Sequence, residues 1–214
     1  MTSEDKTDKR QLILDVAEKL FAELGYDGAS TRLIAKEASV NMAMLNYYFG
    51  GKEGLFIAVF ERKVSSYRIN LQNLNNDLSI TPWEKIERWI DSFTCSVATT
   101  NNFQKIIYRE ITLSQRSEVS QHIIKMLGEN AMELKKIINQ GIQSKVFREV
   151  DTEMLISTLI GTKMYLVNAS PIAAQIFKKD LSNKEVVENE LRPRLKAHLL
   201  ALLKSHLNPT DGQS

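Results

Sequence analysis

The stretch from Ser30 to Lys52, S-T-R-L-I-A-K-E-A-S-V-N-M-A-M-L-N-Y-Y-F-G-G-K, most constrains how this chain can fold. It contains two short helical patterns separated by Ser39-Val40-Asn41, and three residues leave room only for a tight turn. Two helices joined in this way form a helix-turn-helix, whose second helix is able to enter the major groove of DNA. The stretch therefore predicts a DNA-reading module.

Polar and glycine residues mark the ends of both predicted helices. Ser30 precedes the first apolar run and Asn41 precedes the second, and both are candidate N-caps because their side-chain oxygens accept hydrogen bonds from free backbone N–H groups. Gly50-Gly51 follows the second run, and glycine adopts the left-handed conformation that ends many helices. The predicted reader motif therefore covers residues 30–49.

Three sequence motifs lie in and around this stretch. They are L-F-A-E-L-G-Y-D-G-A-S-T, I-A-K-E-A-S-V-N and L-N-Y-Y-F-G-G-K-E-G-L-F, in that order, and together they resemble the DNA-binding domain of TetR-type (tetracycline-repressor-like) transcription regulators. The resemblance covers residues 7–67 and implies an all-α fold. It implies an N-terminal three-helix helix-turn-helix domain at 7–67. The second half of the family varies widely, and we expect residues 75–214 to form a C-terminal helical ligand-binding and dimerisation bundle.

Three residues depart from the family pattern. Ser39 stands where the family usually has a turn glycine, so this serine must adopt a backbone conformation that glycine reaches more easily. Leu33 replaces a common acidic residue and removes a capping-box partner for Ser30. Asn46 replaces a frequent tyrosine, which affects contacts to bases and not the fold.

The charge balance permits DNA binding without demanding it. Residues 1–67 hold nine basic and ten acidic residues, a net charge of −1. Within residues 30–52, however, Arg32, Lys36 and Lys52 face only Glu37, a net charge of +2. Helix N-termini add partial positive charge and N–H groups that suit phosphates.

Composition excludes several other classes of protein. With four prolines and nine glycines in 214 residues, the chain favours helices, and its one cysteine, Cys95, excludes an intrachain disulfide and a multi-cysteine zinc site. No apolar run approaches the ~20 residues that cross a bilayer, and M-T-S-E-D-K lacks a signal-peptide core, so we expect a cytoplasmic protein without a membrane partner. No nucleophile with its base, phosphate loop or carboxylate pair stands at an informative spacing. We therefore expect no catalytic residues, no metal, no cofactor and no enzyme activity.

Helical periodicity in the rest of the chain predicts nine or ten helices and no strand. Thr81-Pro82 begins one helix, Ala169-Ser170-Pro171 closes another, and Ser182-Asn183-Lys184-Glu185 is typical of a capping box. Pro193 predicts a kink or split in the last helix. The predicted helical ranges are 9–24, 52–74, 82–99, 103–113, 117–142, 151–168 and 182–207, besides the two of the reader motif.

The candidate DNA contacts lie in and around the reader motif. By the family's motif, Tyr48 and Lys52 occupy positions that commonly touch the DNA backbone, and Asn46 and Tyr47 occupy positions that reach groove edges. The alternative is that Tyr47, Tyr48 and Phe49 only pack the domain, and Phe49 is expected in the core. The full set of candidates is Ser30, Thr31, Asn41, Met42, Met44, Asn46, Tyr47, Tyr48 and Lys52.

Aromatic, methionine and polar residues between positions 86 and 168 are candidates for binding a largely apolar small-molecule effector. The alternative is that they are ordinary core residues, and that His122 is solvated or satisfied by a neighbour. Buried polar residues such as Glu110, Thr112, Lys163 and Asn168 would orient the ligand. The candidate set is Trp89, Phe93, Phe103, Tyr108, Glu110, His122, Met126, Met164, Tyr165 and Asn168.

The sequence thus predicts a ligand-responsive transcription regulator, a repressor by the resemblance, that leaves an approximately palindromic DNA operator when an effector binds. We expect a homodimer through the helices at 151–168 and 182–207, because the leucines from Leu195 onward cover more of the helix circumference than one neighbour requires. The alternative is a helical small-molecule-binding protein that no longer engages DNA.

Overall fold

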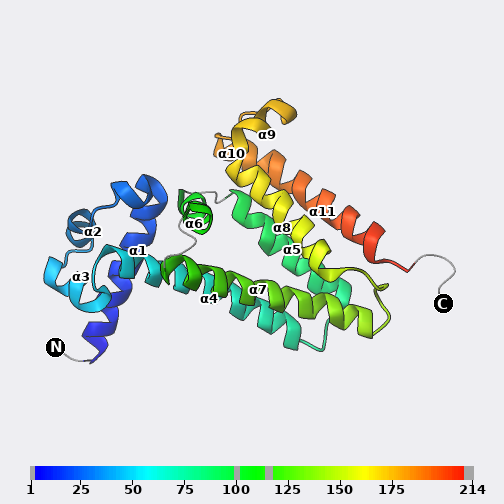
Figure 1. Cartoon of the computed structure of the whole chain (residues 1–214), viewed down its shortest axis with the longest axis horizontal. Helices are drawn as coiled ribbons and strands as arrows, with labels where there is room; N and C mark the ends of the chain where they lie inside the picture. Colours follow the sequence, from blue (N-terminus) through cyan, green and yellow to red (C-terminus); the bar gives the residue numbers. More distant parts are fainter. Residues whose placement is uncertain (1–2, 99–101, 114–117, 210–214) are drawn as a thin grey trace. The chain divides into compact units, whose positions relative to one another are not determined.

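The computed structural model describes residues 3–98, 102–113 and 118–209, and within these ranges helices are the regular secondary structure and no strand occurs (Figure 1). The all-α prediction is confirmed. If α10, η1 and α11 are counted as the one continuous run that they form, the described residues contain ten helical segments, within the predicted nine or ten.

The described helices divide between two compact units, which are Met1–Ser66 with Asn101–Leu127, and Tyr67–Thr100 with Gly128–Ser214. Helices α4 and α7 contribute residues to both. The first unit holds α1 (Ser3–Gly28), α2 (Thr31–Glu37), α3 (Met42–Phe49), the first part of α4 (Lys52–Asn76), α6 (Asn102–Leu113) and the first part of α7 (Glu118–Gln143). The second holds the rest of α4 and α7, with α5 (Pro82–Ala98), α8 (Thr152–Asn168), α9 (Ser170–Phe177), α10 (Lys184–Val186), the π-helical turn η1 (Val187–Leu191) and α11 (Arg192–Leu207).

The core of the first unit forms where the apolar stripes of α1 and α4 meet. Phe21 of α1 packs edge-on against Phe56 of α4 with ring centroids 5.3 Å apart, and Ile34 of α2 and Leu45 of α3 are fully buried in the same cluster. Ile123 of α7 belongs to this cluster too. Residues around α6 and the start of α7 therefore pack with the N-terminal helices. The functional boundaries 7–67 and 75–214 remain a prediction.

Ion pairs fasten α4 to α1 beside this core. Arg62 lies 2.6 Å from Asp15 and 2.6 Å from Glu18, and Lys63 lies 2.5 Å from Glu18. Burial alone would raise the pKa of Glu18, but hydrogen bonds from Lys63 and Arg62 outweigh it and hold that pKa below its usual value. The two helices are thus joined by apolar packing and by charge.

The core of the second unit lies between α5, α8 and α11. Leu195, Leu199, Leu203 and Leu207, spaced four residues apart, are all buried in one cluster with Trp89. These four leucines are therefore covered within the subunit, whereas Leu200 and Leu202 of the same helix stay partly exposed. A dimer face on α11 has to be sought on its outer side.

Local hydrogen bonds explain where the helices begin and end, and three of the predictions at helix ends have to be corrected. Thr81 and Glu84 cap α5 reciprocally, because the Thr81 N–H donates to Glu84 over 2.7 Å and the Glu84 N–H donates to the Thr81 hydroxyl over 3.2 Å. The box expected at 182–185 does not form. Asn183 is the N-cap there and accepts from the Glu185 N–H over 2.9 Å, whereas Ser182 donates to Asp180.

The structure near two prolines, Pro171 and Pro193, differs partly from what the sequence predicts. Ala169-Ser170-Pro171 ends α8 and at the same time begins the unpredicted helix α9, with Pro171 in the first turn where its missing N–H is not needed. Pro193 lies just after η1, where the Arg192 N–H bonds the Val187 carbonyl five residues back. Proline cannot donate an α-helical N–H, and the wider π-helical turn before Pro193 accommodates this. The helical run therefore continues without the predicted kink or split.

We predict that Ser39→Gly stabilises the protein. Ser39 has φ 52°, in the left-handed region that strains a side chain, so glycine should raise the free energy of unfolding by about 0.5–1 kcal/mol. Urea denaturation measures this change. Ser39→Ala, which keeps the β-carbon, is the control and should give no gain, and an equal gain in both variants would contradict the account.

Candidate functional site

The turn between α2 and α3 is shaped by backbone bonds and one left-handed residue. The Val40 N–H donates to Ala35 over 2.9 Å and the Ser39 N–H donates to Lys36 over 3.0 Å, so α2 ends abruptly. Asn41 then accepts from the Met44 N–H over 2.8 Å, and Ser30 accepts from the Leu33 N–H over 3.1 Å. Both predicted N-caps are confirmed.

The end of α3 is held against the start of α4. Gly50 has φ 69° and its N–H donates to Asn46 over 2.8 Å, which confirms the predicted left-handed stop, and Gly51 has φ 133°. A β-carbon on Gly54 would lie 1.9 Å from the Phe49 carbonyl oxygen, closer than any atom can approach. Glycine at position 54 is therefore what lets α4 start so close to α3.

Helix α3 presents a clear outer face. Its inner side is fixed by Leu45 and Phe49, which are 0% and 9% exposed, and Phe49 is confirmed as a core residue. On its outer side Tyr47 is 76% exposed and Met42 is 38% exposed, and Asn46 is exposed as well. The aromatic ring of Tyr47 therefore lies outside the core of the domain. It is available to a partner.

The remaining candidate contacts border this face. Tyr48 is half-buried and packs edge-on against Tyr47 at 5.3 Å between ring centroids. Asn41 and Ser30 are exposed, and Met44 and Thr31 are half-buried. The Lys52 amine lies 4.6 Å from the Tyr26 ring centroid and donates to the Asp27 carbonyl over 3.3 Å. Lys52 is thus held beside the end of α3, where a phosphate-binding amine is useful.

One basic residue at this site escaped the sequence analysis. The Arg10 guanidinium of α1 lies over the Phe49 ring, 5.3 Å from its centroid, and Arg10 is exposed. Its position 39 residues before Phe49 gives no periodic or motif signal of this proximity, which only the fold creates. Arg32 and Lys36 on α2 are exposed as well and add positive charge to the same module.

The candidate effector residues fall into two groups. Tyr108, His122 and Met126 belong to the first unit, where His122 Nε2 lies 2.7 Å from Glu61 Oε1. His122 thus has a protein partner, as the alternative reading held. The second unit contains Trp89, Phe93, Met164, Tyr165 and Asn168, and the side chains of Phe103 and Glu110 lie outside the described residues. The effector site remains a prediction.

Two polar groups among the aromatic residues of the second unit have displaced pKa values. Burial raises the pKa of Tyr67 to about 12, although the Trp89 indole N–H donates to its oxygen over 2.8 Å. Burial lowers the pKa of Lys163 to about 8, and its amine lies 4.4 Å from the centroid of the Phe93 ring. Both shifts arise because an apolar environment disfavours the charged form.

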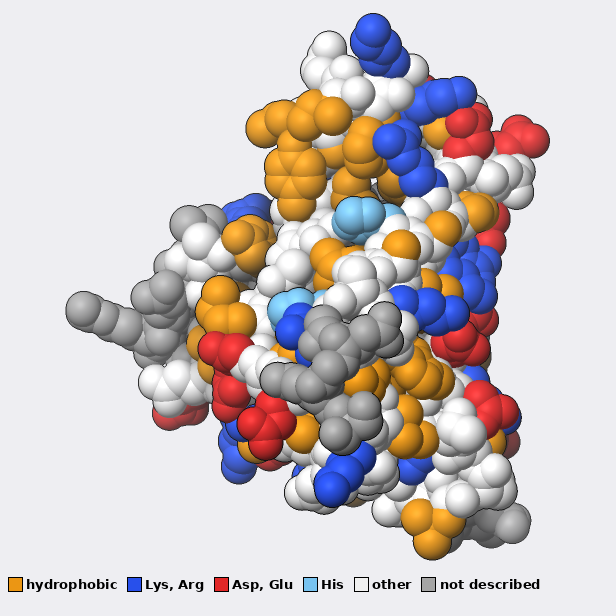
Figure 2. Space-filling model, turned by 90° about the vertical axis from the view of Figure 1, so that its right-hand side faces the viewer, with side chains coloured by type: hydrophobic (Ala, Val, Ile, Leu, Met, Phe, Trp, Pro, Cys, Tyr) orange, Lys and Arg blue, Asp and Glu red, His pale blue; other side chains and the backbone are white. Residues whose placement is uncertain are grey.

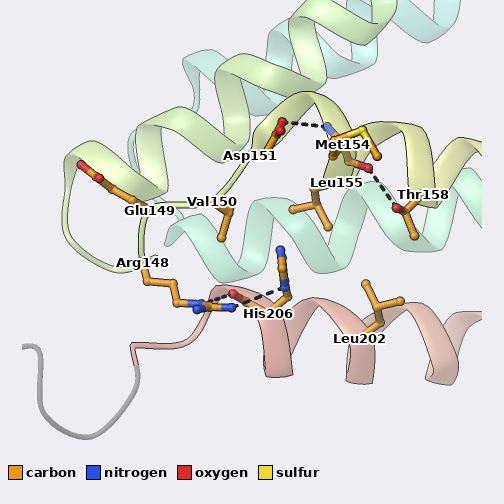
Figure 3. Close-up of a pocket in the computed structure, with 9 residues that line it drawn as sticks. All are labelled: Arg148, Glu149, Val150, Asp151, Met154, Leu155, Thr158, Leu202 and His206. Carbon is orange, nitrogen blue, oxygen red and sulfur yellow. Dashed lines mark hydrogen bonds between the residues drawn. The ribbon is translucent and has the colours of Figure 1, made fainter.

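A hollow of about 450 Å³ opens elsewhere in the second unit, between the start of α8 and the end of α11 (Figure 3). Arg148 borders it and donates to the His206 carbonyl, and its backbone N–H donates to the Leu207 carbonyl over 2.9 Å. None of the candidate effector residues lines this hollow. Its lining residues are Arg148, Glu149, Val150, Asp151, Met154, Leu155, Thr158, Leu202 and His206.

Two other kinds of site are absent from the part of the chain that the structure describes. No three histidine, cysteine or acidic side chains gather there as they would around a metal ion. None of the described helices combines the length and the apolar character needed to span a bilayer.

Comparison with known proteins identifies both halves of the chain. Residues 13–59 match the model of bacterial regulatory proteins of the tetR family, and residues 82–193 match that of the tetracyclin repressor-like C-terminal domain. The chain is 28% identical over 160 residues to the fatty acid metabolism regulator protein of Bacillus subtilis, covering 73% of this chain and 80% of that protein. It is 27% identical over 187 residues to the HTH-type transcriptional repressor NicS of Pseudomonas putida, covering 82% and 84%.

A solved structure gives the same fold. The transcriptional regulator FadR from Bacillus subtilis, in complex with stearoyl-CoA, matches with a TM-score of 0.63 and 24% identity. The match covers 89% of this chain and 97% of that one.

We predict that Gly54→Ala disrupts the DNA-reading module. The added β-carbon meets a backbone oxygen that cannot move aside, so the free energy of unfolding should fall by about 3 kcal/mol or more, and α3 should be displaced. Gly128→Ala in α7, where a β-carbon meets nothing within 4 Å, is the matched control and should stabilise by about 0.5–1 kcal/mol. Thermal unfolding followed by circular dichroism distinguishes the two, and equal melting temperatures would refute the close-approach argument.

Proposed function

The chain belongs to the tetR family of bacterial regulatory proteins, and we propose that it represses transcription by holding a roughly palindromic operator as a homodimer. It is a ligand-responsive, DNA-binding transcriptional regulator. The proposal adds which residues contact DNA, which faces form the dimer and which class of effector releases the operator.

The exposed outer face of α3 carries the proposal. Tyr47 is 76% exposed on α3, whose opposite side is buried, so its ring and hydroxyl are accessible to a partner. Asn46 beside it has the paired donor and acceptor that match adenine. Lys52 and Arg10 supply cations at the edge for phosphate oxygens. This arrangement favours the regulator over a ligand-binding protein that no longer engages DNA.

The dimer is proposed to form on the outer side of α8 and α11. On α8, Met154 and Tyr165 are 62% and 41% exposed and lie on one stripe with Thr158 and Gly161. Small exposed residues Ala197 and Ala201 lie on α11. Figure 2 looks onto this side of the molecule, and hydrophobic side chains gather at its top, the end at which α9 lies in Figure 1. A second copy would cover these side chains and the hollow of Figure 3.

The effector is proposed to be an acyl compound that binds in the helices of the second unit. The support is the name of one relative, a fatty acid metabolism regulator, together with the aromatic residues Trp89 and Phe93 in this unit. Binding there would favour a spacing of the two α3 helices that no longer fits the operator. The protein would act in the cytoplasm, where its DNA lies, and the proposal includes no catalytic step.

We predict specific binding to a site whose half-site centres are about 34–36 Å apart, one DNA turn, or a multiple of it. Tyr48→Phe and Lys52→Gln should weaken binding to all sequences alike, because phosphate contacts carry no sequence information. Asn46→Ala should also relax the preference at one base pair, by about 1–3 kcal/mol. Mobility shifts with selected and scrambled duplexes measure these effects. A wild type without preference for any selected duplex would contradict the proposal.

We predict that Gly161→Arg converts a dimer to a monomer. A β-carbon at Gly161 would meet nothing within 4 Å in its own subunit, and the residue is exposed, so an arginine there should extend outward and oppose a second copy. Gly128→Arg, at another open glycine but away from α8 and α11, is the matched control and should stay dimeric. Sedimentation velocity at micromolar concentration, with circular dichroism as a check on folding, reads the outcome. A wild type that sediments as a monomer, or a dimeric Gly161→Arg, would overturn this interface.

A further inference from the structure

Helix α9 carries apolar side chains on its outer side as well as on its inner side. Its sequence is S-P-I-A-A-Q-I-F, in which Gln175 has the one long polar side chain. Ala173 is buried in the core of the second unit, and Phe177 packs partly against the same cluster. Ile172 and Ile176, four residues apart on another stripe, are 59% and 64% exposed. A helix that is apolar all round is normally covered, so these two isoleucines, here called the α9 ridge, need a partner.

The hollow of Figure 3 lies at the other end of α8 from the α9 ridge (Figures 1 and 3). It is bordered by the start of α8 and the end of α11, and Met154, Leu155 and Leu202 give it an apolar lining. Met154 is 62% exposed, so this lining is open to solvent as well. The second unit thus has an exposed apolar projection at one end of α8 and an open hollow of about 450 Å³ at the other.

The charges around the ridge and the hollow differ in sign. Residues 170–184, which are α9 and the turn after it, hold three lysines and one aspartate, a net charge of +2. The residues that line the hollow hold the carboxylates of Glu149 and Asp151 and the guanidinium of Arg148, a net charge of −1 while His206 is neutral. Two ridges that faced each other would bring like charges together. A ridge that faces a hollow brings opposite charges together.

We propose that the α9 ridge of one subunit fits into the hollow of a second copy, so that the dimer contains two such contacts. This deepens the dimer proposed above and rests on it. A two-fold axis that passes near Gly161, at right angles to α8, exchanges the two ends of that helix between the copies. Gly161 is exposed, and its lack of a side chain lets the two α8 helices approach closely there.

One contact of this kind would satisfy both surfaces. It removes the isoleucines of the α9 ridge from water, and it fills an apolar hollow that the single subunit leaves open. A two-fold axis parallel to α8 would instead place ridge against ridge and hollow against hollow. That arrangement would leave the hollow unfilled and would bring the lysines after α9 close to their own copies.

Disulfide trapping tests the contact. Ile176→Cys and Met154→Cys are made in separate chains in which the exposed Cys95 is replaced by serine, and the two chains, one with an affinity tag, are co-expressed and mildly oxidised. The account predicts a cross-linked species with the summed mass of the two chains on a non-reducing gel. Within one chain, 14 residues of α8, about 21 Å of helix, separate position 154 from the end of α8, whereas a disulfide needs Cα atoms within about 7 Å. The cross-link therefore reports a contact between subunits.

Three matched samples control this result. Ile176→Cys alone and Met154→Cys alone should form no cross-link with their own copies. Ile176→Cys co-expressed with Leu78→Cys should form none either, although Leu78 is 93% exposed in the same unit, because exposure without contact gives only chance collisions.

The affinity of the dimer gives a second measurement. Ile176→Ser should raise the dissociation constant of the dimer about 100-fold, because each dimer contains two contacts and each buried isoleucine contributes about tenfold. Leu78→Ser, which also removes an exposed apolar side chain, should leave that constant unchanged. Sedimentation equilibrium measures both constants, and circular dichroism verifies that both variants fold.

Several outcomes would overturn the inference. A protein that sediments as a dimer but gives no cross-link between positions 176 and 154 would show that α9 serves another partner. A cross-link of Ile176→Cys with its own copy would show that ridge meets ridge, and an equal yield with Leu78→Cys would show chance collision. A wild type that sediments as a monomer would overturn the dimer itself together with this inference.

Discussion

The contact between the last carbonyl of α3 and the first turn of α4 is the constraint on which the reader depends. Only a glycine at position 54 permits that approach, since a β-carbon would lie 1.9 Å from the Phe49 oxygen. The approach sets which residues of α3 point outward, because Leu45 and Phe49 must turn into the core and Tyr47 then faces solvent. The ion pairs of Arg62 and Lys63 hold α4 to α1 behind it. A few short-range contacts thus define the surface offered to DNA.

Sequence reasoning worked best where structure is decided by neighbouring residues. The caps Ser30 and Asn41 and the stop at Gly50 were predicted correctly because each bonds a group only three or four residues away. The left-handed Ser39 followed from the family's glycine at that position. Competing caps were less predictable. Ser182 and Asn183 are adjacent, and Asp180 takes the serine hydroxyl, which leaves capping to the asparagine.

Long-range packing was the part that the sequence could not supply. Apolar periodicity shows that a helix has a buried face but not which neighbour covers it, so His122 and Met126 were grouped with Trp89 although they belong to the other compact unit. Of the leucines of α11, Leu195, Leu199, Leu203 and Leu207 are buried within the subunit and Leu200 and Leu202 only partly, a division that the sequence did not reveal. Arg10 near Phe49 and Lys163 near Phe93 are contacts across the fold, and no spacing in the sequence encodes them.

The central claim is that the outer face of α3 lies in the DNA groove, and site-specific photo-crosslinking tests it most directly. A photoreactive phenylalanine replaces Tyr47, the 76% exposed ring on α3, or Leu78, which is 93% exposed in the other unit. With a selected duplex, the account predicts crosslinks from position 47 to bases within each half-site and none from position 78. An absence of crosslinks from position 47 to a duplex that the labelled protein still binds would contradict it.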